Sequence, residues 1–253
     1  MVLRSIHDWF RRIFGPAPAL DDGTWKKVLP RVRGARRLSV PERDTLRQQV
    51  REFLHHKQFI AAAGFELQDE HRYAIAIQAC IPILHIGVEA YRGFRTIYVF
   101  PDTLRERADE WRPGQYVGEI AGLAIQGGGV ALAWTEAHRG FADAGDGYNP
   151  VIHEFAHKLD MMDGAADGRP PLPDGITQRE WFETFSRAFA DFQTRIDRGF
   201  ATGLSDYAAT NPAEFFAVLS EVYFEDPDVL EREYPGVMHL LRGFYTQRTV
   251  AVE

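Results

Sequence analysis

The sequence has one cysteine, Cys80, among its 253 residues. An internal disulfide is therefore excluded, and cysteine thiolates cannot build a structural zinc site. We expect Cys80 to be a small buried hydrophobic residue. So low a cysteine content is typical of a protein from a reducing compartment.

Long apolar runs and a basic excess are also missing. No run of about 18 apolar residues is present, so we expect no membrane-spanning helix. Near the N-terminus, Asp8, Arg11 and Arg12 interrupt any stretch of signal-peptide type, and we therefore expect a cytoplasmic protein. The net charge of −7 argues against a nucleic-acid binder, which usually carries a basic excess. Internal repeats and low-complexity segments are absent from the sequence.

Apolar residues are plentiful, although they form no long uninterrupted run. Hydrophobic residues make up 45% of the chain and aromatic residues 13%, which is enough for a substantial core. A chain of 253 residues forms one large domain or two small ones.

The N-terminal segment is basic. Residues 1–15 place apolar side chains at helical spacing with arginines between them. This pattern predicts an amphipathic helix that touches a membrane surface or a partner, a terminal helix packed on its own domain, or a frayed tail. Residues 16–23 are predicted to form a linker. A basic cluster follows, either a solvated face or a surface for an anionic partner, and consists of Arg31, Arg33, Arg36 and Arg37.

Two helices are predicted next. Ser39 and Glu42 form a capping box, and the helical spacing of apolar residues continues from there to about Lys57. A second, apolar helix is predicted over residues 69–85, where Pro82 either kinks or shortens it.

Three strands are predicted after these helices. Residues 96–100 are β-branched and aromatic, and residues 118–125 and 130–135 are two further strand candidates. Residues 126–129 read Gln-Gly-Gly-Gly and are predicted to join the last two as a hairpin. Residues 130–134 are either an edge strand that pairs with a substrate backbone or a purely structural strand.

The most specific pattern in the chain is H-E-x-x-H at residues 153–157. On a helix, residues four apart share a face, so His153 and His157 can bind one metal ion as half of a tetrahedral zinc site. Glu154 lies about 100° further round the helix and can reach a metal-bound water as a general base. The alternative is a chance match on an amphipathic helix. The apolar neighbours of the two histidines favour a buried helix beside a cleft instead.

The boundaries of this helix also follow from the sequence. Asn149 is predicted to cap it, with Pro150 in the first turn, and it should end near residues 163–164. Residues 165–176 are predicted to be a loop and residues 178–198 a helix, whose phenylalanine stripe is typical of a core.

A third ligand must come from further along the chain. Asp160 lies on the helix of the two histidines, where it is better placed to support a ligating histidine or to be an ordinary helix-end residue. Glu214 lies in the first turn of an otherwise apolar helix that Asn211 caps, and a buried carboxylate there requires a cation or a hydrogen-bond partner. We therefore predict that Glu214 is the third ligand. Glu221 shares its face and is either a fallback ligand or a supporting carboxylate.

Tyr207 precedes this helix in the chain. It either donates a hydrogen bond to the oxyanion that forms during catalysis or packs as an ordinary tyrosine before a helix.

The assembled motifs resemble the Mlc titration factor A family of bacterial zinc peptidases. The residues that carry the resemblance are Gly64-Phe65-Glu66-Leu67, Asn149 with His153 through Asp160, Tyr207-Ala208-Ala209 and Pro212 through Glu221. The resemblance covers most of the chain after about Arg37. The catalytic half is also similar to the lethal-factor type of zinc endopeptidase domain, which has a similar tyrosine followed by Glu-Phe-Phe-Ala.

The resemblance implies the same site. His153, His157 and Glu214 become the Zn²⁺ ligands, Glu154 the catalytic base and Tyr207 an oxyanion stabiliser. It also implies a cytoplasmic protein with aminopeptidase activity that binds the glucose repressor Mlc. One departure is Val218, which occupies the position where many glutamate-ligand zinc peptidases carry an acid that supports a ligating histidine. That support must come from elsewhere, from Asp160 or Glu221.

We therefore expect an α+β fold with a zincin-like metallopeptidase core, in which a small, mostly antiparallel sheet accompanies two metal-binding helices. The predicted parts are a tail and linker over residues 1–37, a helical part over residues 38–90 and a catalytic core over residues 91–253. The predicted function is hydrolysis of peptide or protein substrates by a water that zinc and Glu154 activate. The alternative is a regulatory protein that sequesters a transcriptional repressor of sugar uptake and whose zinc site is structural.

Overall fold

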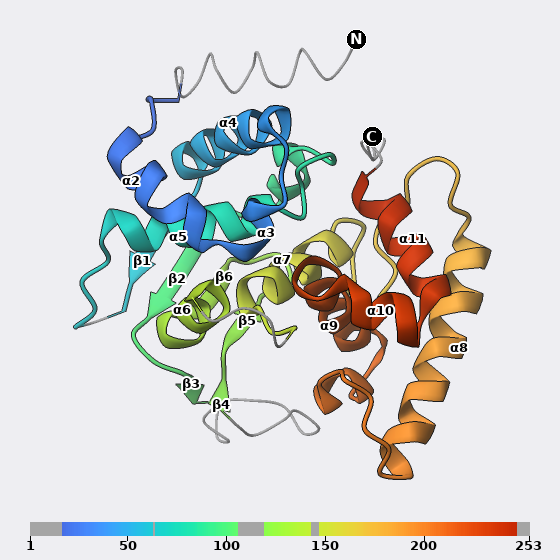
Figure 1. The fold of residues 1–253 in the computed structure, drawn as a ribbon. Helices are drawn as coiled ribbons and strands as arrows, with labels where there is room; N and C mark the ends of the chain where they lie inside the picture. The colour runs from blue at the N-terminus through green and yellow to red at the C-terminus, as the bar shows by residue number, and fades with distance from the viewer. Residues whose placement is uncertain (1–16, 63, 106–118, 143–146, 247–253) are drawn as a thin grey trace.

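The computed structural model describes residues 17–62, 64–105, 119–142 and 147–246 (Figure 1). The helix expected over residues 1–15 lies outside them. The α-helices and 3₁₀ helices are α2 (Asp22–Val28), η1 (Leu29–Arg31), α3 (Arg33–Arg36), α4 (Val40–His56), α5 (Asp69–Cys80), η2 (Val88–Tyr91), α6 (Trp134–Ala142), α7 (Pro150–Asp160), α8 (Gln178–Asp197), η3 (Asp206–Ala209), α9 (Pro212–Glu225), α10 (Pro227–Glu233) and α11 (Pro235–Thr246). The strands are β1 (Gln58–Ala61), β2 (Thr96–Phe100), β3 (Leu104–Arg105), β4 (Glu119–Ile120), β5 (Gly122–Ala124) and β6 (Val130–Ala133).

The N-terminal helices are more extensive than predicted. Helix α2 begins at Asp22, inside the expected linker, and its Trp25 is only 5% exposed. Helices α2 and α3 pack on the rest of the molecule, so the expectation of a tail or linker up to residue 37 is wrong for residues 22–36. The predicted boundaries at residues 38 and 91 stay predictions.

Helix α4 confirms the capping box. The backbone N–H of Ser39 donates to the Glu42 carboxylate over 2.8 Å, and the helix ends at His56. Helix α5 ends at Cys80, earlier than the predicted residue 85. Pro82 explains this difference because proline has no backbone N–H with which to continue the helix. Cys80 is fully buried, as expected.

The main sheet has four strands in the order β1-β2-β6-β5. Strands β1 and β2 are parallel, as are β2 and β6, whereas β5 and β6 are antiparallel. The expectation of a mostly antiparallel sheet is therefore wrong for this mixed sheet. A helical crossover through α5 joins β1 to β2, which is the kind of connection that parallel neighbours require. A separate two-stranded antiparallel sheet contains β3 and β4.

The hairpin between β5 and β6 is confirmed. The Ile125 N–H donates to the Gly129 carbonyl over 3.0 Å, and the Gly128 N–H donates to the Ile125 carbonyl over 2.9 Å. However, β6 lies inside the sheet between β2 and β5, and its residues are buried. The proposal that residues 130–134 form an edge strand for substrate is therefore wrong, and the two end strands of this sheet among the described residues are β1 and β5.

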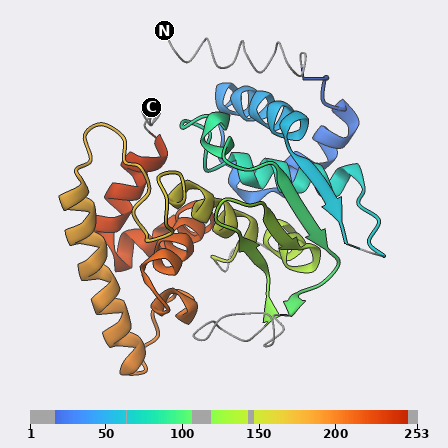
Figure 2. The same cartoon turned by 180° about the vertical axis from the view of Figure 1, so that it is seen from behind.

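The remaining helices enclose the site. Helix α7 is buried along its whole length and packs beside α9. Figures 1 and 2 show the strands in the half of the molecule that also holds α2–α5, whereas α8–α11 form the other half and α7 lies between them. Trp181, Phe185 and Phe192 of α8 are buried and Phe189 packs against the core, whereas Phe182 is 54% exposed, so the stripe belongs to the core except at Phe182. In the part of the chain that the structure describes, no helix is both long enough and apolar enough to span a membrane.

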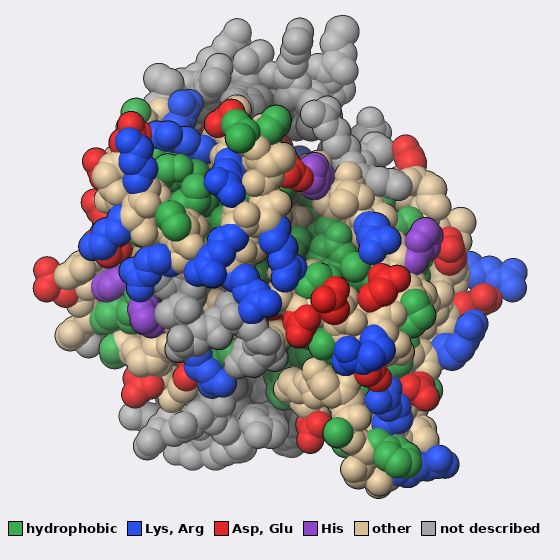
Figure 3. All heavy atoms as spheres, viewed as in Figure 1, with side chains coloured by type: hydrophobic (Ala, Val, Ile, Leu, Met, Phe, Trp, Pro, Cys, Tyr) green, Lys and Arg blue, Asp and Glu red, His purple; other side chains and the backbone are tan. Residues whose placement is uncertain are grey.

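The basic cluster lies on the N-terminal helices. In Figure 3, lysine and arginine side chains gather over this part of the surface. Arg33 and Arg37 are close enough to Glu225 of α9 to act against the rise in its pKa that burial causes. At least part of the cluster therefore has an anionic neighbour within the molecule.

Candidate metal centre

The site is built on two helices that begin in the same way. The Asn149 side chain accepts a hydrogen bond from the Ile152 N–H, and the Asn211 side chain accepts one from the Glu214 N–H, each over 3.0 Å. A proline follows each asparagine in the first turn, where its missing N–H is harmless. These caps confirm the predicted starts of α7 and α9.

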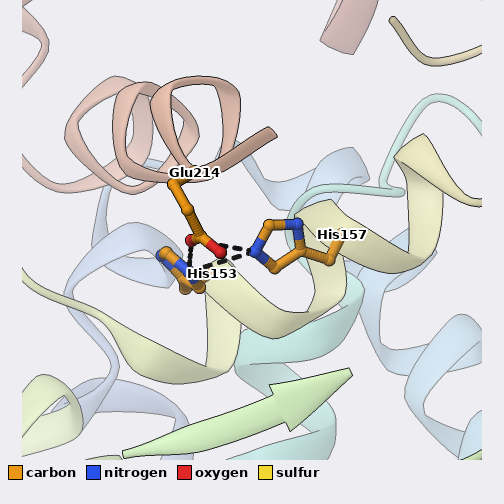
Figure 4. A group of neighbouring side chains, drawn as sticks. All are labelled: His153, His157 and Glu214. Carbon is orange, nitrogen blue, oxygen red and sulfur yellow. Dashed lines mark hydrogen bonds and ion pairs between the residues drawn. The ribbon is translucent and has the colours of Figure 1, made fainter. Parts of the chain in front are cut away.

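The two helices bring His153, His157 and Glu214 together (Figure 4). The Nε2 atoms of His153 and His157 lie 3.2 Å apart. Glu214 Oε2 lies 3.0 Å from His153 Nε2 and 3.2 Å from His157 Nε2. Three potential ligand atoms from α7 and α9 thus converge on one point.

These separations fit a small metal ion. Metal–ligand bonds of about 2.0–2.1 Å in a tetrahedron place neighbouring ligand atoms about 3.3 Å apart. The three observed separations of 3.0, 3.2 and 3.2 Å are close to that edge length. Two imidazole nitrogens and one carboxylate oxygen form a common catalytic zinc donor set, which leaves a fourth position for water.

The charges at the site also call for a cation. Burial raises the pKa of Glu214, but hydrogen bonds from His153 and His157 outweigh this effect and hold the pKa well below its usual range. Burial lowers the pKa of His153, yet Glu221 and Glu214 together raise it well above the usual value. Both pKa shifts indicate that the carboxylates stabilise a positive charge at this point. A bound metal ion would supply that charge.

Glu221 supports one of the histidines. Its Oε1 lies 2.6 Å from His153 Nδ1, on the side of the ring away from Glu214, and its Oε2 accepts the Asn149 N–H over 2.6 Å. A carboxylate at Nδ1 fixes the tautomer that leaves Nε2 available for a metal. Glu221 therefore supports a candidate histidine ligand, as an acid at the position of Val218 does in many glutamate-ligand zinc peptidases.

Asp160 has a different role. Its carboxylate accepts the backbone N–H groups of Gly168 and Arg169, each over 2.8 Å. It is thus a helix-end residue that fixes the following loop, and the alternative of histidine support is wrong for it. Burial raises the pKa of Asp160 to about 6.

Glu154 lies between the two histidines and strand β5. It is 5% exposed, and burial raises the pKa of its carboxyl group. The nearby Ala124 backbone amide opposes this rise in the pKa. On the other side it touches Gly122, where an added Cβ would lie only 2.6 Å from Glu154 Cγ. The geometry gives Glu154 one fixed position beside the candidate ligands.

Tyr207 lies at the rim of the site. Its side chain is 40% exposed, and its ring centroid lies 6.0 Å from that of His153. Two cavities meet at Gly122, His153, Glu154 and Tyr207. One cavity, of about 240 Å³, extends past the Gly122 end of β5, and the other, of about 470 Å³, extends past Ala124. The candidate centre is therefore open to a cavity at the Gly122 end of β5 and to another at the Ala124 end.

The sequence analysis did not identify three residues that lie next to the site. Gly122 lets β5 approach Glu154 closely, and Lys158 holds the β5–β6 hairpin against α7. Glu225 accepts a hydrogen bond from Asn149 Nδ2 over 2.8 Å. Glu225 was detectable because it lies one turn after Glu221 on an apolar helix. No local sequence pattern marked Gly122 as a neighbour of the site.

A mixed sheet and two helices that present two histidines and a glutamate define a zincin-like fold with a candidate metal site. The family model "Glucose-regulated metallo-peptidase M90" matches residues 7–246, so the chain belongs to this metallopeptidase family.

Several relatives are similar over most of their length. A Klebsiella pneumoniae protein named Mlc titration factor A is 35% identical over 227 residues, which cover 85% of this chain and 82% of the relative. A protein of the same name from Escherichia fergusonii is 32% identical over 243 residues, which cover 91% and 88%. An uncharacterized protein of Synechocystis sp. is 34% identical over 228 residues, which cover 87% and 82%. The resemblance to the Mlc titration factor A family is confirmed.

Proposed function

We propose that this protein is a zinc-dependent peptidase in which His153, His157 and Glu214 hold the metal and Glu154 is the general base. The observation that carries the proposal is the convergence of the three ligand atoms within 4.8 Å beside the buried Glu154 carboxylate. Bound zinc would lower the pKa of a coordinated water towards about 7 and polarise the substrate carbonyl.

The side chains of this chain then have distinct tasks. Glu154 accepts the proton of the attacking water on its carboxylate and passes it to the leaving amine. The raised pKa of Glu154 favours the first step, because a carboxylate with a raised pKa is a stronger base towards the attacking water. Tyr207, at the rim, donates a hydrogen bond to the oxyanion.

Strand β5 offers a track for the substrate backbone. The Ala133 N–H bonds to the Ala121 carbonyl and the Ile125 N–H to the Gly129 carbonyl, so these residues of the β5 segment direct their backbone groups to β6. Successive backbone groups of a strand alternate in direction, and Gly122 and Ala124 therefore direct theirs towards the site. A peptide that pairs with this side of β5 passes over Glu154.

An aminopeptidase requires an acidic group for the substrate amine. The carboxylates that line the cavity on the Ala124 side are Glu154, Glu214 and Asp167. We propose Asp167 for this task, since the other two have roles in the chemistry. Activity that is unchanged by N-acetylation of the substrate and by Asp167→Asn would show an endopeptidase instead.

The decisive experiment is Glu154→Gln. We expect the variant to bind one zinc per chain and to lose peptidase activity by at least about 10³-fold, because the amide cannot accept the proton. Zinc content by elemental analysis and peptide hydrolysis are the two measurements. Full activity of Glu154→Gln, or wild-type protein that takes up no zinc, would contradict the proposal.

The printed name of the relatives favours a second candidate function. We propose that the chain also binds an Mlc-like transcriptional repressor in the cytoplasm, as the name Mlc titration factor A suggests for those proteins. Repressor binding by Glu154→Gln with unchanged affinity would separate this role from peptidase activity. If the wild type binds zinc and repressor but cleaves nothing, the zinc site is structural.

A further inference from the structure

The cavity at the Gly122 end of β5 has apolar walls. Its volume of about 240 Å³ corresponds to roughly eight water molecules of liquid at about 30 Å³ each, which is room for one large side chain. The apolar side chains on its walls are Tyr148, Pro150, Leu204, Val218 and Val222. They come from the start of α7, from α9 and from the segment before η3.

Apart from Glu154, the polar side chains on these walls already have partners. Both Glu221 oxygens are engaged, by His153 and by the Asn149 N–H. The Tyr148 hydroxyl donates to Glu136 Oε2 over 3.1 Å, and Ser205 Oγ accepts the Tyr207 N–H over 3.4 Å. Away from Glu154, a charged side chain that entered this cavity would lose its hydration without gaining a new hydrogen-bond partner, which is unfavourable.

The walls are also fixed in place. The Arg139 guanidinium lies 5.1 Å from the centre of the Tyr148 ring and, like Tyr148, is close to Glu136. Val218 and Val222 are each 3% exposed on a helix that is buried along most of its length. At Gly147 an added Cβ would lie 3.3 Å from Val222 Cγ2, so glycine keeps this side clear. The cavity is therefore preformed.

The direction of β5 sets which part of a substrate reaches the cavity. Antiparallel pairing is slightly more stable per residue than parallel pairing. A peptide antiparallel to β5 has its N-terminal part at Ala124 and its C-terminal part at Gly122. The cavity at Gly122 then faces the side chain that follows the scissile bond.

We propose that this cavity is the main specificity pocket and accepts a large, uncharged apolar side chain, aliphatic or aromatic, immediately C-terminal to the cleaved bond. This inference rests on the proposed peptidase function and adds its substrate class. Val222 on α9 and Leu204 before η3 are the residues that determine the preference.

The test uses the zinc-loaded full chain and a mixture of peptides with free amino termini, whose cleavage sites are mapped by mass spectrometry. A series that varies only the residue after the scissile bond then gives kcat/KM for each side chain. We expect Leu and Phe to exceed Gly, Asp and Lys by about 10–200-fold, the range that a single apolar pocket provides.

Two variants link the preference to this wall. Val222→Ala and Leu204→Ala enlarge the cavity, so each should raise the ratio of kcat/KM for Trp over Leu by about 10-fold. Val237→Ala is the matched control, because Val237 is equally buried but lies on α11, away from the cavity. It should lower stability while leaving the ratio unchanged. The two wall variants lie on different elements, so a folding defect in one leaves the other informative.

The outcomes separate this inference from the proposed function. A wild type that cleaves no peptide contradicts the peptidase proposal itself. Cleavage with a flat profile after the scissile bond, a preference for Lys or Asp there, or a profile that both wall variants leave unchanged would overturn the specificity pocket alone.

Discussion

At the scale of single residues, Gly122 has the tightest requirement near the site. An added Cβ would lie 2.6 Å from Glu154 Cγ and 2.8 Å from its Oε1, and real Cβ atoms do not approach other atoms so closely. Either β5 or the glutamate must move when this residue gains a side chain. Because Glu154 is buried, its carboxylate has little space in which to move without leaving its position beside the two histidines.

We therefore predict that Gly122→Ala lowers kcat by about 10²-fold, the size of effect that a displacement of about 1 Å has on a catalytic group. Zinc content should be unchanged, since the three proposed ligands lie on α7 and α9. Gly93→Ala is the matched control, because an added Cβ there meets nothing within 4 Å, and its activity should equal that of the wild type. Equal kcat values for Gly122→Ala and the wild type would show that Glu154 does not depend on this contact.

At the scale of elements, Lys158 joins the motif helix to the β5–β6 hairpin. Its Nζ donates to the carbonyls of Ile125 over 2.6 Å and Gly128 over 2.9 Å, and it lies 4.9 Å from the Phe94 ring centre. Burial lowers the pKa of Lys158 to about 8. The lysine thus fixes the position of β5 against α7.

Lys158→Met keeps the apolar stem and removes both hydrogen bonds. We predict that it raises KM by about 3–10-fold with a smaller change in kcat, and lowers the free energy of unfolding by about 1–3 kcal/mol, because two hydrogen bonds from a charged donor to partly buried carbonyls are lost. Lys26→Met, at an exposed position of α2, is the control and should change neither quantity. Steady-state kinetics and urea unfolding measure both effects. A kcat decrease without any KM change would indicate that the lysine acts on the chemistry rather than on the position of β5.

The helices and strands differ in how well they could be predicted from the sequence. Helices α7 and α9 were predicted because their signals are local: each has an asparagine cap, a proline in the first turn and an apolar stretch. Glu214 followed from the cost of burying an unpaired carboxylate. Strand β1 was missed because it has only four residues and none of them is buried. Its parallel pairing with β2, and the interior place of β6, depend on segments far apart in the chain, which local patterns do not specify.

At the scale of the whole molecule, the candidate centre joins the two halves of the fold. α7 lies between the half that contains the sheet and the half that contains α8–α11, and Glu214 on α9 meets the histidines of α7 there. The same contact includes the buried bonds from Asn149 to Glu221 and Glu225. A metal ion that binds only the folded state should therefore stabilise the whole chain.

We predict that removing zinc with a chelator lowers the midpoint of thermal unfolding and that adding zinc back restores it. At a zinc concentration of 1,000 times Kd, linkage gives about 4 kcal/mol of stabilisation. For a chain of this size that corresponds to about 8–16 °C, at about 2–4 °C per kcal/mol. Glu214→Gln should show a much smaller shift, because it lacks the carboxylate ligand, whereas Glu183→Gln, on the exposed side of α8, should shift like the wild type. Calorimetric scans of the three proteins, with and without chelator, measure this. Equal shifts in Glu214→Gln and the wild type would place the metal elsewhere.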